Sequence, residues 1–185
     1  YEQNTDKIKI IDQRLIPFEL KIIELNTVDE VCFAIKEMQV RGAPLIGVTA
    51  AYGMYIAARE KVDLKEASEK INATRPTAVN LSWALNKIMT NIKDINSDEL
   101  PDKILELANK IRKDDITNCN NIGKHGYKLI KEVYEKNNKP VNILTHCNAG
   151  WLATVDWGTA LAPVFVAHKN NIPIHVWVDE TRPRN

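Results

Sequence analysis

The sequence lacks the features that mark membrane-spanning and nucleic-acid-binding proteins. No apolar run reaches the roughly 20 residues that a membrane-spanning helix needs, and the first residues do not have the charged-then-apolar layout of a signal peptide. Neither sign of charge dominates, because 25 Lys and Arg residues stand against 24 Asp and Glu residues, a net charge of +1. Basic and aromatic side chains are not interleaved as in RNA-binding proteins. We therefore expect neither a nucleic-acid partner nor a membrane partner.

Cysteine is scarce, and its spacing does not suggest paired use. The three cysteines are Cys32, Cys119 and Cys147. They form neither an even-numbered set nor a CxxC pair, which is typical of a reducing compartment, so we expect a cytoplasmic protein. A zinc site made of His146, Cys147, His168 and His175 would have none of the usual ligand spacings. The sequence thus favours neither a disulfide framework nor a bound metal.

Glycine-rich phosphate loops are also missing. Neither GxGxxG nor GxxxxGK[ST] occurs, so neither a dinucleotide-binding loop nor a P-loop is supported. What the chain does have is an ordinary globular composition, with 44% hydrophobic and 26% charged residues among 185. This length suits one or two small domains with a substantial core.

The N-terminal part begins with strand-like runs. Residues 7–12 and 18–25 are rich in isoleucine and are separated by a break, which predicts a small hairpin or meander. Thr27 and Glu30 then form the T-x-x-E pattern of a capping box, which predicts a helix over about 28–39.

Helices dominate the middle of the chain. Further helices are expected over about 44–60, 63–73 and 79–93. From residue 101 to about 135 an apolar stripe predicts a long helix; its positions are Ile104, Ala108, Ile111, Cys119, Ile122, Leu129 and Val133. Asp115 lies on this stripe, either as a buried, hydrogen-bonded carboxylate or facing a cleft. Gly123 and Gly126 indicate either close packing or a bend.

The pattern changes after residue 140. Residues 141–146 and 172–179 read as buried strands, and residues 159–169 between them read as a helix, so this is a βαβ unit with parallel strands. Cys147 and Asp179 then lie at the carboxyl ends of the two strands, where open α/β sheets bind their ligands.

Cys147 admits two interpretations. A free cysteine is usually a small buried hydrophobe, but the polar or small neighbours of Cys147 and its place at a strand end equally suit a reactive thiol. We expect no Cys–His dyad with His146, because adjacent residues of a strand point to opposite faces.

Two arginines precede predicted helix starts. Arg41 in "VRGAP" and Arg75 in "TRPT" either are ordinary surface residues beside turns or hold an anion near free helix N–H groups. Gly42 would let a ligand approach the backbone. Gly158 and the Thr159 hydroxyl offer either a further phosphate contact or a plain helix cap.

Four motifs together resemble one family. "MQVRGAPLIGVTAAYGM", "TRPTAVNL", "THCNAGWLATVDWGTALAPVFVAH" and "IHVWVDETRP" are similar, in order and spacing, to the methylthioribose-1-phosphate isomerases of methionine salvage and methionine biosynthesis. The resemblance implies that Cys147 is the active-site cysteine and that Arg41, Gly42, Ala43 and Arg75 contact substrate.

The reaction implied is an aldose–ketose isomerisation of 5-methylthioribose 1-phosphate to 5-methylthioribulose 1-phosphate, with neither a metal nor an organic cofactor. Phosphate on the anomeric oxygen prevents simple opening to an aldehyde, so an acid must assist ring opening before hydrogen moves between C2 and C1. A thiol near C2 could relay a proton or stabilise the transition state, and apolar walls, including Trp151, would hold the methylthio group.

The same resemblance implies a fold and its extent. We expect an α/β protein, with a small β-hairpin and a mainly helical N-terminal domain over residues 1–138. The first βαβ unit of a Rossmann-like parallel domain follows over 139–185. Family members continue further and supply a catalytic aspartate and an Asn–Lys pair, so we expect an N-terminal fragment that is inactive alone and a homodimer at full length.

Two alternatives stay open within this resemblance. One is a related isomerase acting on ribose 1,5-bisphosphate or 5-deoxyribose 1-phosphate. The other is a non-catalytic regulatory subunit like those of the translation-initiation exchange factor, against which Cys147, Arg41 and Arg75 argue.

Overall fold

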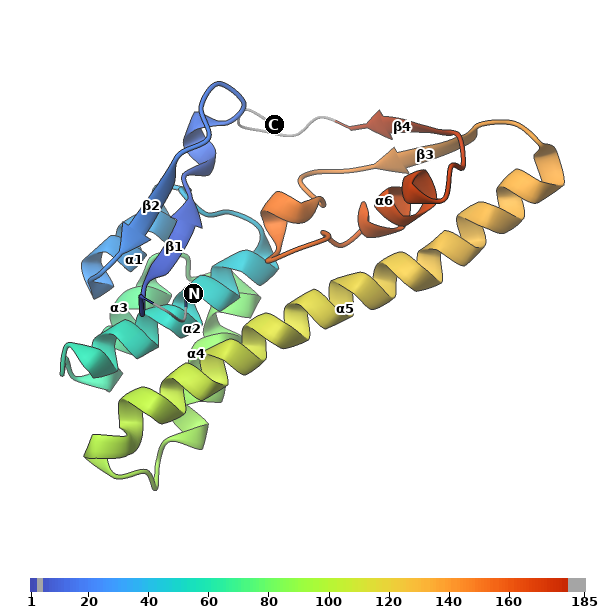
Figure 1. Cartoon of the computed structure of the whole chain (residues 1–185). Coiled ribbons are helices and arrows are strands. Elements are labelled where there is room, and N and C mark those ends of the chain that lie inside the picture. The colour runs from blue at the N-terminus through green and yellow to red at the C-terminus, as the bar shows by residue number, and fades with distance from the viewer. Residues whose placement is uncertain (3–4, 180–185) are drawn as a thin grey trace. The chain divides into compact units, whose positions relative to one another are not determined.

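The computed structural model describes residues 1–2 and 5–179 (Figure 1). The strands are β1 (Ile8–Ile11), β2 (Ile22–Leu25), β3 (Val141–Thr145) and β4 (Ile174–Val178). The helices are α1 (Val28–Lys36), α2 (Ala43–Arg59), α3 (Leu64–Ala73), α4 (Val79–Asn91), α5 (Leu100–Asn137) and α6 (Ala162–Lys169). Short 3-10 turns are η1 (Gln13–Leu15), η2 (Ser97–Glu99) and η3 (Trp151–Ala153). This is an α/β protein that is mostly helical, with two small sheets.

The chain divides into two compact units, residues 1–113 and 114–185, with the division inside α5. We expected the domain boundary between residues 138 and 139, just after the C-terminal end of α5. That boundary stays a prediction. Each unit is described by itself below. No helix among the described residues is long and apolar enough to cross a membrane.

The first unit begins with the expected hairpin. β1 and β2 pair antiparallel, with Ile8 opposite Leu25, and both of these side chains are buried. The capping box is confirmed, because the Glu30 amide donates to the Thr27 hydroxyl while the Glu30 carboxylate accepts the Thr27 amide. It opens α1, which ends at Lys36, a few residues earlier than expected.

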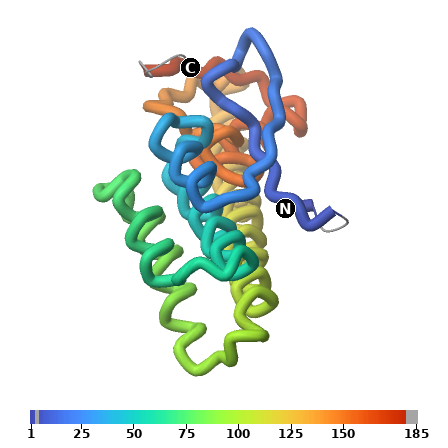
Figure 2. The backbone as a smooth tube through the Cα atoms, turned by 90° about the vertical axis from the view of Figure 1, so that its left-hand side faces the viewer, coloured from blue at the N-terminus to red at the C-terminus, as the bar shows by residue number. Residues whose placement is uncertain are grey.

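Helix α2 forms the centre of the first unit. Every residue from Ile46 to Ala57 is buried, and Figure 2 shows α1 to α4 grouped together. A helix that is apolar on all sides must be surrounded in this way. Gly53 permits the close packing of α1 against α2, because a Cβ at this position would lie only 2.8 Å from the Val31 Cγ1 atom of α1.

The second unit contains the predicted βαβ arrangement. β3 and β4 are parallel, with Val141 opposite Ile174, and α6 connects them. A small core joins Ile130, Val141, Ala167 and Ile172. The expectation of parallel strands is therefore confirmed.

The glycines of α5 serve close packing. A Cβ at Gly123 would lie 3.1 Å from the Val166 Cγ2 atom of α6, and one at Gly126 would collide with the Pro163 ring. Helix α5 runs unbroken past both positions. Of the two readings, packing is therefore the one that holds, and the bend does not occur.

One feature of this unit was not predicted, and one expectation is wrong. Ile122, Leu129 and Val133 are exposed, because α6 packs against the neighbouring face of α5 that carries Gly123 and Gly126. Helix α6 begins at Ala162 and not at Thr159, since the backbone before it is used to close a loop, as described next.

Candidate active site

Cys147 lies two residues beyond the carboxyl end of β3 and is exposed. Its φ of +63° places it in the left-handed region, which costs a non-glycine residue on the order of 1–3 kcal/mol and is frequent at functional sites. The other two cysteines differ. Cys119 is buried, and burial raises the pKa of its thiol to about 11, while burial also raises the pKa of Cys32. Cys147 is thus the most exposed of the three cysteines.

The strand alternation does not extend to Cys147. β3 ends at Thr145, so His146 is already outside the strand and Cys147 has left-handed geometry. The expectation that His146 and Cys147 must point to opposite faces of a strand is therefore wrong in its premise, since alternation requires extended backbone at both residues.

A compact loop follows Cys147. The Ala149 carbonyl accepts hydrogen bonds from the Thr159 amide at 3.0 Å and the Leu161 amide at 3.3 Å, which closes the loop. Gly158, at φ +83°, lies so close to the Ala149–Gly150 backbone that a Cβ would collide with it. The Thr159 amide is thereby used in loop closure, and Thr159 is not the cap of α6, whose N-cap is Leu161.

The loop has polar ties inside it. The buried Thr154 hydroxyl donates to the Asp156 carbonyl at 3.0 Å and accepts the Gly158 amide at 3.1 Å. Trp151 starts the short turn η3 and is 46% exposed, whereas the Trp157 ring is covered by the Lys169 ammonium group at 4.5 Å. The 3-10 turn has only three residues, so no long helix begins directly after Cys147.

Asp115 anchors this loop to α5. Its carboxylate accepts the Val155 amide at 2.8 Å, and the Cys119 thiol lies 3.8 Å from the other carboxylate oxygen. Burial raises the pKa of Asp115, against the effect of the Val155 hydrogen bond. The hydrogen-bonded reading of Asp115 is the one that the structure supports.

A second polar pair joins the ends of the two strands. The His146 Nδ1 atom lies 2.8 Å from an Asp179 carboxylate oxygen, and the Asp179 amide donates to the Thr145 carbonyl at 2.9 Å. Sequence reasoning placed both residues near this sheet edge but did not pair them. The available signal was that each directly follows one of two parallel strands.

The two helices that follow the arginine-bearing loops pack together in the first unit. Gly42, at φ +105°, is the N-cap of α2, and α4 begins at Val79 after the N-cap Ala78. Neither cap residue has a side chain that can accept a hydrogen bond from the first N–H groups of its helix. A Cβ at Gly47, one turn into α2, would lie 2.9 Å from the Asn80 carbonyl oxygen of α4. The first turns of both helices are therefore in contact.

An arginine precedes each of these helix starts. Arg41 directly precedes Gly42 and Ala43, and Arg75 precedes α4 within a turn closed by the Ala78 amide and the Arg75 carbonyl at 3.0 Å. The first turns of α2 and α4 contain no acidic side chain. Helix N-termini and guanidinium groups are the kinds of group that hold anions, so these two helix starts are the candidate anion site of the first unit.

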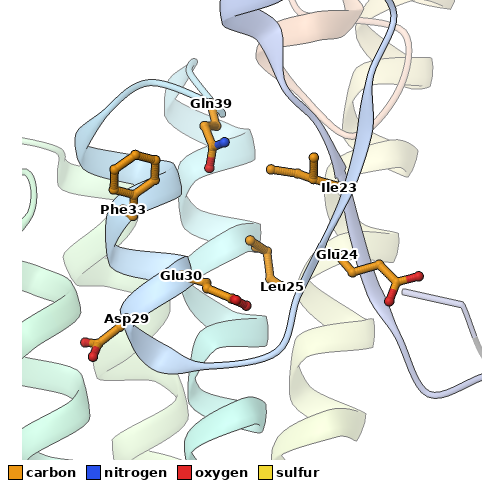
Figure 3. A pocket seen from close by; sticks show the side chains of 7 residues that line it. All are labelled: Ile23, Glu24, Leu25, Asp29, Glu30, Phe33 and Gln39. Atoms are coloured by element: carbon orange, nitrogen blue, oxygen red, sulfur yellow. The ribbon is translucent and has the colours of Figure 1, made fainter.

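A cavity of about 430 Å³ lies elsewhere in the first unit, between β2 and α1 (Figure 3). Its acidic side chains are already used: Glu24 pairs with Lys7, Asp29 pairs with Lys70, and Glu30 caps α1. The remaining lining is mainly apolar, with Ile23, Leu25 and Phe33. This cavity offers no reactive group and is not the candidate active site.

No cluster of three or more His, Cys, Asp or Glu side chains that could hold a metal ion occurs among residues 1–2 and 5–179. The chemistry available at the strand ends is therefore that of the Cys147 thiol, the His146 imidazole and the Asp179 carboxylate.

Known proteins resemble this chain along its whole length. It is 48% identical over 187 residues to the methylthioribose-1-phosphate isomerase of Methylorubrum extorquens, covering 100% of this chain and 51% of the relative. It is 49% identical to the enzyme of that name from Escherichia coli O45:K1, covering 96% and 49%. The chain thus spans about half the length of the curated relatives it matches.

Solved structures give the same picture. The crystal structure of 5-methylthioribose 1-phosphate isomerase from Pyrococcus horikoshii matches with a TM-score of 0.85 and 38% identity, over 99% of this chain and 52% of that one. The translation initiation factor eIF-2B subunit delta from A. fulgidus matches with a TM-score of 0.76 and 37% identity, over 96% and 53%. Residues 39–185 match the Initiation factor 2 subunit family, IF-2B, and the chain therefore belongs to that family.

Proposed function

We propose that this chain is the N-terminal half of an aldose–ketose isomerase that converts 5-methylthioribose 1-phosphate to 5-methylthioribulose 1-phosphate in methionine salvage. The observation that carries the proposal is the similarity, along the whole chain, to proteins named methylthioribose-1-phosphate isomerase. The exposed Cys147 thiol on a strained turn at the carboxyl end of a parallel strand supports it.

In this proposal the substrate phosphate binds at the anion site of the first unit. Arg41 and Arg75 supply charge, and Gly42 and Ala43 supply backbone N–H groups at the start of α2. The close contact at Gly47 supports this assignment, because it holds the first turns of α2 and α4 together. The phosphate is the part of the substrate that does not react, so binding it positions the sugar.

Cys147 is the reactive residue of the proposal. Its thiol is exposed, whereas the thiols of Cys32 and Cys119 are half-buried and buried. It would relay a proton or stabilise charge near C2 while hydrogen moves to C1. The partly exposed Trp151 would form part of the wall around the methylthio group.

The remaining assignments concern the complete protein. We infer that residues 139–185 begin a Rossmann-like domain that continues beyond them, with residues 1–138 as a separate helical domain. The parallel β3–α6–β4 unit supports this inference. We further expect a cytoplasmic homodimer that uses neither a metal nor an organic cofactor, and no activity from these 185 residues alone.

A second candidate is a non-catalytic regulatory subunit, which the similarity to an eIF-2B delta subunit favours. The related sugars ribose 1,5-bisphosphate and 5-deoxyribose 1-phosphate are the other candidate substrates. An isomerase of the methylthio sugar, an isomerase of one of the other two sugars and a regulatory subunit differ in which sugar phosphate, if any, the complete protein converts.

The test is an assay of the complete protein on all three sugar phosphates. We expect at least about a tenfold higher kcat/KM for the methylthio sugar. A tenfold preference for another sugar would reassign the substrate, and a folded protein that turns over none of them would favour the regulatory subunit.

The matched variants are Cys147→Ser and Cys32→Ser. We expect Cys147→Ser to lower kcat by about 10²-fold or more, and Cys32→Ser to leave it close to that of the wild type. Unchanged turnover in Cys147→Ser would show that the thiol is structural.

A further inference from the structure

His146 and Asp179 form a pair that the proposed roles do not use. The Nδ1 atom of His146 and a carboxylate oxygen of Asp179 are 2.8 Å apart, although 33 residues separate them in sequence. Both side chains are largely exposed, at 75% and 59%. An exposed pair of this kind contributes little to the stability of a folded protein, so stability alone does not account for it.

The sheet brings these residues together by its register. Thr145 and Val178 are opposite each other at the ends of the parallel strands β3 and β4. His146 directly follows β3, and Asp179 directly follows β4. The hydrogen bond from the Asp179 amide to the Thr145 carbonyl, at 2.9 Å, extends the strand pairing by one residue. The backbone of Asp179 is thus fixed, and its carboxylate is held at the carboxyl edge of the sheet.

The hydrogen bond also fixes the imidazole. When Nδ1–H donates to a carboxylate, Nε2 becomes the ring atom that exchanges a proton, and the carboxylate stabilises the imidazolium form. Histidine is the side chain whose ordinary pKa lies closest to neutral pH, which suits a group that both gives and takes a proton. Among the described residues, the titratable group in contact with His146 is Asp179, and the Cys147 thiol follows His146 directly in the chain.

We propose that His146 is the catalytic acid that opens the sugar ring and that Asp179 is its positioning residue. This inference rests on the proposed isomerase function. It assigns the proton donor that an aldose 1-phosphate requires, because phosphate on the anomeric oxygen blocks direct opening to an aldehyde.

The step balances as a single proton transfer. The His146 imidazolium gives its Nε2 proton to the ring oxygen while the bond from that oxygen to C1 breaks. The electron pair of this bond stays on the oxygen, which becomes the C4 hydroxyl, and C1 is left as an oxocarbenium stabilised by its phosphate-ester oxygen. After hydrogen has moved from C2 to C1, the 2-hydroxyl loses a proton as the ketone forms. That proton restores the imidazolium, so the cycle consumes none.

The position of His146 beside Cys147 fits this division of work. β3 ends at Thr145, and the left-handed backbone of Cys147 turns the chain directly after His146. One residue then serves the ring oxygen and the next serves C2, from consecutive positions on one fixed strand end. The loop closed at Ala149 holds the segment that follows.

The experiment compares His146→Gln, Asp179→Asn and the control His168→Gln in the complete protein. His168 is also exposed, but it lies in the last turn of α6. We expect His146→Gln to lower kcat by about 10²- to 10³-fold with little change in KM, and to remove the limb of the kcat–pH profile that histidine ionisation produces. Asp179→Asn should lower kcat about tenfold and leave KM within about twofold of the wild-type value, while His168→Gln should match the wild type.

The inference is overturned if His146→Gln keeps a third or more of the wild-type kcat or the same pH limb. If the wild type is still active and Cys147→Ser is inactive, the proposed isomerase function stands and only the role of His146 fails. Failure of the His146 role and failure of the isomerase function are therefore distinguishable. A wild type inactive on every sugar phosphate would remove both. Circular dichroism and the urea midpoint of each variant check that lost activity is not lost folding.

Discussion

The two units bury their apolar side chains to different extents. In the first unit α2 is surrounded by other helices, and each of its residues from Ile46 to Ala57 is buried. In the second unit β3 and β4 leave Leu144, Trp177 and Val178 exposed, and α5 exposes Leu129. A two-stranded sheet is at best marginal in water. The first unit therefore buries more apolar surface than the described part of the second, whose apolar core is the small cluster around Ile130 and Val141.

The units also differ in the surroundings of a carboxylate, which is buried at Asp12 and half-buried at Asp115. In the first, Asp12 accepts hydrogen bonds from the Arg14 guanidinium and the Gln39 amide, which lower its pKa to about 2. In the second, Asp115 has no cation among its recorded hydrogen-bond partners in the described residues, and burial raises its pKa. Acid should therefore weaken the first unit through Asp12 and not the second through Asp115.

The largest expected effect tests the contrast in burial. Ile56→Ala removes a fully buried side chain from α2 and should lower the free energy of unfolding by about 2–5 kcal/mol. Leu129→Ala, on the exposed face of α5, should change it by less than about 0.5 kcal/mol. Urea unfolding measures both, and amide hydrogen exchange assigns each loss to a unit. Comparable losses from the two variants would contradict the contrast.

The next effect concerns Asp12. Because its folded-state pKa lies below the ordinary value of 3.8, its stabilisation is present above pH 3.8 and is lost as pH falls towards about 2. The shift corresponds to about 2 kcal/mol at neutral pH. Asp12→Asn should remove this amount and flatten the acid limb of stability between about pH 4 and 2, as measured by urea midpoints across pH. An unaltered acid limb would show that Asp12 is not its source.

The smallest effect concerns Asp115. Since its folded-state pKa is raised, the stability linked to its protonation is fully present below pH 3.8 and is lost as pH rises through the raised pKa. Asp115→Asn keeps an oxygen for the Val155 amide and removes the buried charge, so it should be close to neutral at pH 7. Asp115→Ala leaves that amide without its acceptor and should cost about 1 kcal/mol. Urea unfolding separates the two, and equal losses would mean that the charge, not the hydrogen bond, matters.

Much of the fold could be predicted from local signals. The capping box at Thr27 and Glu30, the alternation of apolar residues in the hairpin and the change to strand–helix–strand after residue 140 act within a few residues. Such patterns are set by backbone geometry and are visible in one sequence.

The errors arose where a distant partner decides the outcome. The apolar stripe of α5 predicted the helix but not what covers it: Ile122 and Leu129 are exposed, and α6 packs on the face that carries Gly123 and Gly126. The start of α6 depends on the Ala149 carbonyl, which takes the amides of Thr159 and Leu161. Periodicity identifies an apolar face but not which neighbour will cover it.

The candidate site divides in the same way. The position of Cys147 at a strand end and the glycine–arginine loops were evident from the sequence. The partners of His146 and Asp115 could not be predicted, because they lie 33 and 40 positions away in the sequence, respectively. Their roles as catalytic or substrate-binding groups stay predictions until the variants are measured.

The backbone at Cys147 has a consequence for substitutions at this position. Its left-handed φ of +63° favours glycine or asparagine, and a cysteine there makes the turn harder to form. A substitution to glycine should relax the turn while it removes the thiol. Cys147→Gly should therefore raise the free energy of unfolding slightly while it removes the thiol, so that at this position stability and the proposed chemistry can be measured separately.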